Sequence, residues 1–117
     1  MFQKILEDVL PTINGARAAI FLDGDGESIA QAGEHAGDMQ FLAAWKEIHL
    51  DHIREIAERL GMGSIHAVLF SLDEGNELVI PVVDEYSLIV FLSSYAHIRD
   101  ALAGLKNAVE MLKKEMQ

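Results

Sequence analysis

The chain has 117 residues, half of them hydrophobic, and a formal net charge of −10. This length favours a single domain, residues 1–117, with enough apolar content for a well-formed core. The excess of carboxylates disfavours binding to nucleic acid or to an anionic membrane surface, because phosphate contacts need clustered Lys and Arg. The lack of cysteine in the sequence excludes disulfides, thiolate zinc sites and cysteine nucleophiles.

No apolar run in the sequence is long enough to span a bilayer. The N-terminus leads directly into an amphipathic segment and lacks the apolar centre of a signal peptide. We therefore expect a soluble, cytoplasmic protein that does not insert into membranes.

The first predicted element is an amphipathic helix over residues 2–10, whose apolar side chains share one stripe. Pro11 should end or kink it, because a proline disfavours the helical conformation of the residue before it. The stretch 18–33 is typical of a β-hairpin, in which an apolar arm meets a turn of Asp and Gly residues. The first arm is apolar on both faces, which predicts an interior strand, whereas the alternating second arm suits an edge.

The longest predicted helix covers residues 39–60, from an N-cap at Asp38 to a stop at Gly61. Its apolar side chains spread over about half of the helix circumference, which is wider than the stripe that one sheet face covers. We therefore expect a dimer interface with a second copy of the chain, formed by Trp45, Ile48, His49, His52 and Ile56. An acidic stripe on the other side of this helix consists of Glu47, Asp51, Glu55 and Glu58.

Three more strands are predicted over residues 64–72, 77–83 and 86–93. Pro81 lacks a donor, so part of the second of these strands should be unpaired on one side or at its terminus. The third is apolar on both faces and should lie inside the sheet. A last helix, capped by Ser93 or Ser94, should pack on the core through Ile98, Leu102, Leu105, Val109, Leu112 and Met116.

Two turn motifs have the spacing of ligand sites without the residues that those sites need. The carboxylates of 23–27, with Glu34, are spaced as in an EF-hand calcium loop, but Ser28 stands where that loop needs glycine and a strand precedes it. The pair Gly24 and Gly26 lacks the third glycine of a dinucleotide-binding loop. We therefore interpret the stretch as a plain hairpin turn and predict no cofactor.

His49 and His52 lie on one face of the predicted helix, where they could share a metal ion. The sequence does not place a third ligand, although His35, His66 or Asp51 could serve. The favoured interpretation is a pair of half-buried histidines at the seam between two subunits, without metal. No serine lies in a nucleophile elbow and there is no phosphate-binding Gly-x-x-x-x-Gly-Lys loop, so we predict no catalytic residues.

Three stretches and the order of elements carry a resemblance to a known family. The stretches are Leu-Pro-Thr-Ile-Asn-Gly-Ala at 10–16, Phe-Leu-Asp-Gly-Asp-Gly-Glu-Ser-Ile-Ala at 21–30, and the last strand running through Ser93 and Ser94 into an amphipathic helix. In these features the chain resembles the Roadblock/dynein light chain domain, in particular the small bacterial stand-alone members that regulate a Ras-like GTPase. The resemblance covers essentially the whole chain.

The resemblance implies an α+β fold, a five-stranded antiparallel sheet with two helices on one face and one long helix on the other. This is the three-layer arrangement of roadblock domains and profilins. The resemblance also implies a homodimer made through the long helix and the third strand. Members of the family act as platforms for small GTPases, and some are GTPase-activating without donating an arginine finger.

We therefore interpret the chain as a non-enzymatic, dimeric regulator or scaffold that binds a Ras-like small GTPase. The acidic stripe is the predicted contact, because a negative platform speeds the encounter with a basic partner. The alternative is a small-molecule sensor with a pocket between sheet and helix. A third hypothesis is a metal-dependent enzyme built on His49 and His52.

Overall fold

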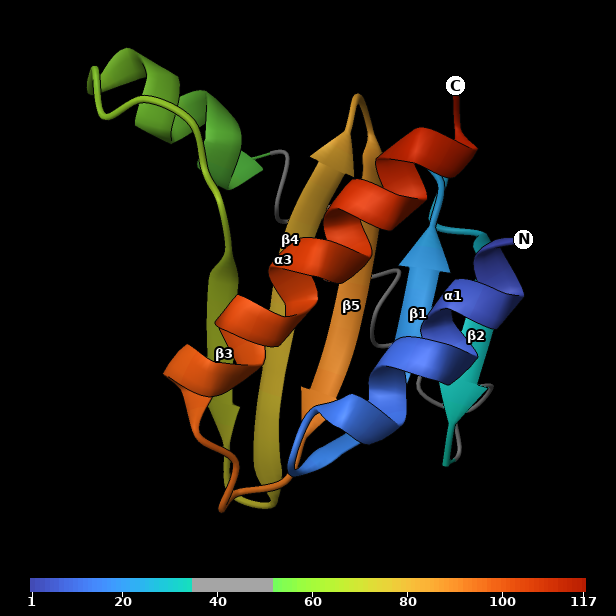
Figure 1. Ribbon diagram of the computed structural model, residues 1–117. Coiled ribbons are helices and arrows are strands. Elements are labelled where there is room, and N and C mark those ends of the chain that lie inside the picture. The colour runs from blue at the N-terminus through green and yellow to red at the C-terminus, as the bar shows by residue number, and fades with distance from the viewer. Residues whose placement is uncertain (35–51) are drawn as a thin grey trace.

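A computed structural model describes residues 1–34 and 52–117 of the chain. Five strands form one antiparallel sheet in the order β2-β1-β5-β4-β3 (Figure 1). Their bounds are β1 Ala16–Leu22, β2 Ser28–Gly33, β3 Val68–Leu72, β4 Gly75–Val83 and β5 Tyr86–Leu92. The predicted α+β class with a five-stranded antiparallel sheet is confirmed.

Two helices, α1 (Phe2–Val9) and α3 (Ile98–Glu115), lie side by side on one face of the sheet (Figure 1). The short helical turn η1 (Leu10–Thr12) follows α1 and contains Pro11, which ends the helix as predicted. The resemblance implied two helices on one face of the sheet, and α1 and α3 are these two helices.

Residues 52–59 form a further helical stretch, the described end of the predicted long helix, whose residues 39–51 lie outside the described part. It stops where predicted, because Gly61 adopts the left-handed conformation with φ +66°. The N–H groups of Gly61 and Met62 donate to the carbonyl groups of Glu58 and Ala57. This pair of bonds is a Schellman cap, which ends a helix at a glycine.

The sheet order confirms the predicted places of the strands. β1 pairs with β2 on one side and with β5 on the other, so it is interior, and residues 18–22 are all buried. β2 is an edge strand, and β5 lies at the centre. Pro81 pairs with Ser87 of β5 but lies beyond the last β3–β4 pair at Val79, so its missing donor breaks no ladder on that side.

The core on the helix side of the sheet is centred on β1 and β5. Phe21 of β1 is fully buried, and its ring centroid lies 5.2 Å from that of Phe2 on α1 and 5.8 Å from that of Tyr86 on β5. Burial of large side chains here supplies the main driving force for folding. The opposite face of the sheet buries a second set: Ala18, Ile20, Leu22, Val79, Ile89 and Phe91.

The structure corrects three predictions about element ends and packing. β3 begins at Val68 rather than at residue 64. α3 begins after His97, because Ser93 forms a turn instead of a cap: its N–H donates to the Gly15 carbonyl at 2.7 Å and its carbonyl accepts from Ala96. Leu102 is exposed, whereas the helix face toward the sheet consists of Ala101, Leu105, Ala108, Val109 and Leu112. The two small alanines allow α3 to approach the sheet closely.

Candidate interaction surface

Large apolar side chains are exposed along the helical stretch 52–59 and the turn after it: Ile53, Ile56, Leu60 and Met62. His52 at the start of the stretch is also exposed. Of the predicted dimer interface, His52 and Ile56 thus lie on an accessible apolar surface, while Trp45, Ile48 and His49 lie outside the described residues. Clustered exposed apolar side chains are typical of interaction sites.

Residues 63–67 connect this stretch to β3, which forms the edge of the sheet on the same side of the molecule (Figure 1). Leu69 and Leu72 of β3 are both exposed. The strand has no Lys, Arg or Pro, which are residues that natural edge strands use to prevent pairing with another chain. The pattern of residues alone did not identify this edge, although the resemblance implied a dimer made through the third strand. We call β3 together with residues 52–62 the β3 surface.

The predicted acidic stripe is described in part. Glu55 and Glu58 are exposed, and Glu55 forms an ion pair with Arg59 at 3.0 Å, one turn further along the helix. Glu47 and Asp51 lie outside the described residues. An exposed pair of this kind contributes little to stability, so both carboxylates remain available for a partner.

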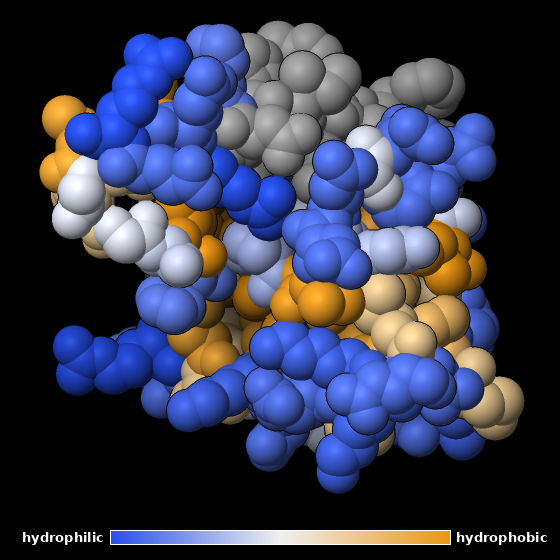
Figure 2. Space-filling view, turned by 90° about the horizontal axis from the view of Figure 1, so that it is seen from above, coloured by the Kyte–Doolittle hydropathy of each residue, from blue (hydrophilic) through white to orange (hydrophobic). Residues whose placement is uncertain are grey.

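A groove with a volume of about 520 Å³ lies between α3, the strand β4 and residues 65–67, which precede β3. Its lining is mainly apolar, and it includes Ile65, Ala67, Ile80, Leu102 and Val109, with His66, Lys106 and Glu110 as the polar groups. Figure 2 shows apolar side chains in the recess at the left, where this groove opens. The groove has the position that the small-molecule alternative requires.

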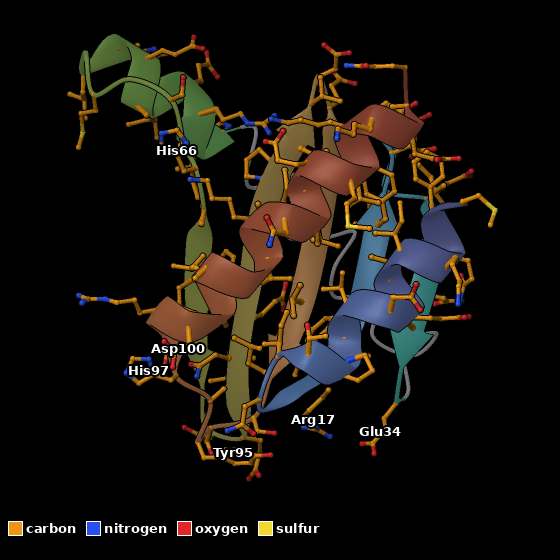
Figure 3. All side chains as sticks on the ribbon, viewed as in Figure 1. Arg17, Glu34, His66, Tyr95, His97 and Asp100 are labelled. Carbon is orange, nitrogen blue, oxygen red and sulfur yellow. The ribbon has the colours of Figure 1, made fainter. Side chains whose placement is uncertain are left out.

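The hairpin between β1 and β2 is a plain turn, as predicted. The Asp23 carboxylate accepts hydrogen bonds from the backbone N–H groups of Asp25 and Glu27, at 2.9 and 3.0 Å. Within residues 1–34 and 52–117, no three His, Asp or Glu side chains are grouped so as to hold a metal ion. His97 pairs with Asp100 at 3.4 Å at the start of α3, far from His66 (Figure 3).

Glu77 of β4 is a buried carboxylate that was not predicted from the sequence. It is fully buried on the face away from α1 and α3, in register between Phe70 of β3 and Phe91 of β5. Glu77 has an interaction partner. Such a partner is expected, because a buried carboxylate loses its hydration and must be stabilised by other contacts. Glu77 lies two positions before Val79 in the strand, so both side chains point to the same buried face, and this spacing could have predicted the burial of Glu77.

No helix in the described ranges of the chain is long and apolar enough to cross a membrane.

No protein-family model and no curated protein matches the sequence. Solved structures do match. The Roadblock/LC7 domain from Streptomyces avermitilis has a TM-score of 0.87 at 16% identity, covering 97% of this chain and 96% of that one. MglB from Myxococcus xanthus has a TM-score of 0.87 at 16% identity, with 98% and 94% covered. An MglB with a tetrameric arrangement has a TM-score of 0.84 at 19% identity, with 97% and 85% covered. The chain therefore has the Roadblock/LC7 fold, as the resemblance implied.

Proposed function

We propose that this chain of Roadblock/LC7 fold is a non-enzymatic, homodimeric regulator or scaffold for a Ras-like small GTPase in the cytoplasm. The observation that carries the proposal is the β3 surface, an unprotected sheet edge together with the exposed apolar side chains of the preceding helical stretch. The fold supports the choice of partner, because roadblock domains are platforms for small GTPases.

The dimer would join two β3 surfaces. Pairing of two β3 edges would satisfy the backbone N–H and C=O groups that an edge strand leaves open. It would also cover Leu69 and Leu72, together with the apolar side chains of residues 53–62. Full burial of a large aliphatic side chain is worth about 1.5–3 kcal/mol, so several such residues are enough for a stable pair. The tetrameric MglB is an example of assembly in a protein of this fold.

The GTPase would dock on the acidic stripe. Glu55 and Glu58 are exposed on the same helix as Ile56, so a dimer would carry two such stripes. The chain as a whole has 19 acidic and 9 basic side chains, and this excess favours a partner with a basic face. Long-range attraction of this kind acts mainly on the association rate.

Charge reversal tests this docking site. We expect the double variant Glu55→Lys with Glu58→Lys to associate with the GTPase about tenfold more slowly at low ionic strength, because the attraction becomes repulsion. The difference should shrink at high salt, where the charges are screened. Stopped-flow fluorescence with a labelled nucleotide on a purified Ras-like GTPase measures the rate.

The matched control is Asp25→Lys with Glu27→Lys, which changes the net charge equally at two exposed residues of the β1–β2 turn. Equal slowing by both double variants would assign the effect to overall charge. Unchanged association of the Glu55 and Glu58 variant would place the docking site elsewhere, with the face formed by α1 and α3 as the next candidate.

A further inference from the structure

We infer that the cavity beside the start of β1 binds a small monocarboxylate with an apolar body. This cavity has a volume of about 610 Å³ and is lined by Leu10, Pro11, Arg17, Glu34, Ser93 and Tyr95. Such a volume lies in the usual range of small-molecule sites, about 300–1,000 Å³. The cavity opens at the β1 and β2 side of the sheet, whereas β3 forms the opposite edge, so the inference does not depend on the proposed dimer.

The cationic group of this cavity is Arg17. Its side chain is half-buried and forms no hydrogen bond or ion pair in the part of the chain that the structure describes. The two other half-buried cations in that part have partners: Lys113 pairs with Glu110, and Arg54 has an interaction of its own. In so acidic a chain, a guanidinium without a carboxylate partner beside a cavity is open to a carboxylate from outside. The planar guanidinium fork fits a carboxylate with two parallel hydrogen bonds.

The walls beside Arg17 fit an apolar body. Leu10 and Pro11 line one part of the cavity, and Tyr95, which is 72% exposed, lines another. Figure 3 shows Arg17 at the start of β1, between Tyr95 and Glu34. A ligand seated there would remove apolar surface of Tyr95 from water while its carboxylate met Arg17.

Backbone hydrogen bonds hold the strand that carries Arg17 on both sides. The Glu34 N–H donates to the Arg17 carbonyl at 3.0 Å, and the Ser93 N–H donates to the Gly15 carbonyl at 2.7 Å. Gly33 has φ +97°, and a Cβ there would clash with the Arg17 carbonyl, so the close approach of the two strands needs this glycine. The backbone that carries the site is therefore fixed before a ligand binds, which lowers the entropy that binding must overcome.

The charge of the lining favours a monocarboxylate over a phosphate. Among the described residues of the lining, Arg17 is the only cation, and Glu34 carries a carboxylate in the same lining. A dianion would gain one favourable contact and meet repulsion from Glu34 and from the net charge of −10. A monoanion with a neutral or cationic far end avoids most of that repulsion.

Hexanoate and its uncharged analogue hexanamide are the probes, titrated into the intact ¹⁵N-labelled chain while amide shifts are recorded. We expect saturable shifts at residues 15–17, 33–34 and 93–95 with hexanoate, and at least about tenfold weaker binding of hexanamide, because hydrogen bonds to charged groups are the stronger ones. Arg17→Gln should weaken hexanoate binding about tenfold as well. Arg99→Gln, which removes an exposed arginine of α3, should leave it unchanged.

Four results would overturn the inference: no saturable hexanoate binding below about 10 mM, equal binding of both probes, normal binding by the Arg17 variant, or tighter binding of inorganic phosphate than of hexanoate. If Arg17→Gln does not fold, Tyr95→Ala replaces it, because that side chain is mostly in solvent. Tyr95→Ala should weaken hexanoate binding several-fold and acetate binding hardly at all. An equal effect on hexanoate and acetate binding would show that Tyr95 does not contact the apolar body of the ligand.

Discussion

The variant Ile56→Asp is expected to be monomeric at concentrations at which the unmodified chain is a dimer. Ile56 is 49% exposed in the single chain, so the variant should fold normally. In the proposed dimer, however, the aspartate would be buried without a partner, which costs several kcal/mol for a charged group. A penalty of about 3 kcal/mol raises the dissociation constant of the dimer roughly a hundredfold.

Sedimentation velocity across a concentration series measures this shift. The matched control is Met111→Asp, because Met111 is 43% exposed on α3 and lies outside the β3 surface. The control should keep the dissociation constant of the unmodified chain. Dimerisation of Ile56→Asp at unchanged strength would show that subunits associate through a different face, and a monomeric unmodified chain would remove the dimer altogether.

Phe21→Ala should have the largest effect on folding. Its ring is fully buried and contacts Phe2 of α1 and Tyr86 of β5, so its removal leaves a cavity between the helix layer and the sheet. Loss of a buried phenylalanine lowers the free energy of unfolding by about 3–5 kcal/mol. That is a large fraction of the stability of a domain, which is about 5–15 kcal/mol.

Urea unfolding followed by circular dichroism checks this expectation, with Phe21→Leu as the control. The leucine variant keeps most of the buried apolar volume and should lose less than about 1.5 kcal/mol. A loss below about 1 kcal/mol for Phe21→Ala would contradict the central place of this ring, because even a well-relaxed cavity costs more.

The elements that the sequence predicted well are those fixed by local chemistry. Gly61 stops a helix because it takes the left-handed conformation, and Asp23 closes the hairpin turn with its own carboxylate. The interior positions of β1 and β5 could be predicted because each strand is apolar on both faces. Each of these signals lies within a few residues along the chain.

What the sequence could not predict depends on residues that are distant along the chain. Ser93 looked like a helix cap, but its N–H is bonded to Gly15, almost eighty positions away. Leu102 had the right helical spacing, yet α3 turns the face of Ala101 and Ala108 toward the sheet.

The candidate site was predictable only in part for the same reason. The spacing of Glu55 and Glu58 placed them on one helix face, and both are exposed. Spacing alone could not show that β3 is an edge strand, because that follows from strand order. Nor could it show that Arg17 and Tyr95 line the same cavity, because one lies at the start of β1 and the other in the turn before α3, far apart along the chain.

The proposed function is tested most directly by the binding of a purified Ras-like GTPase to the unmodified chain, measured by calorimetry with the GTPase in its GDP form and with a non-hydrolysable GTP analogue. A regulator of the nucleotide cycle must distinguish the GDP form from the GTP form, because a protein that binds both forms with equal affinity does not shift the equilibrium between them. We expect at least about tenfold tighter binding to one nucleotide form than to the other. No binding to either form by a chain that is folded and dimeric would contradict the account.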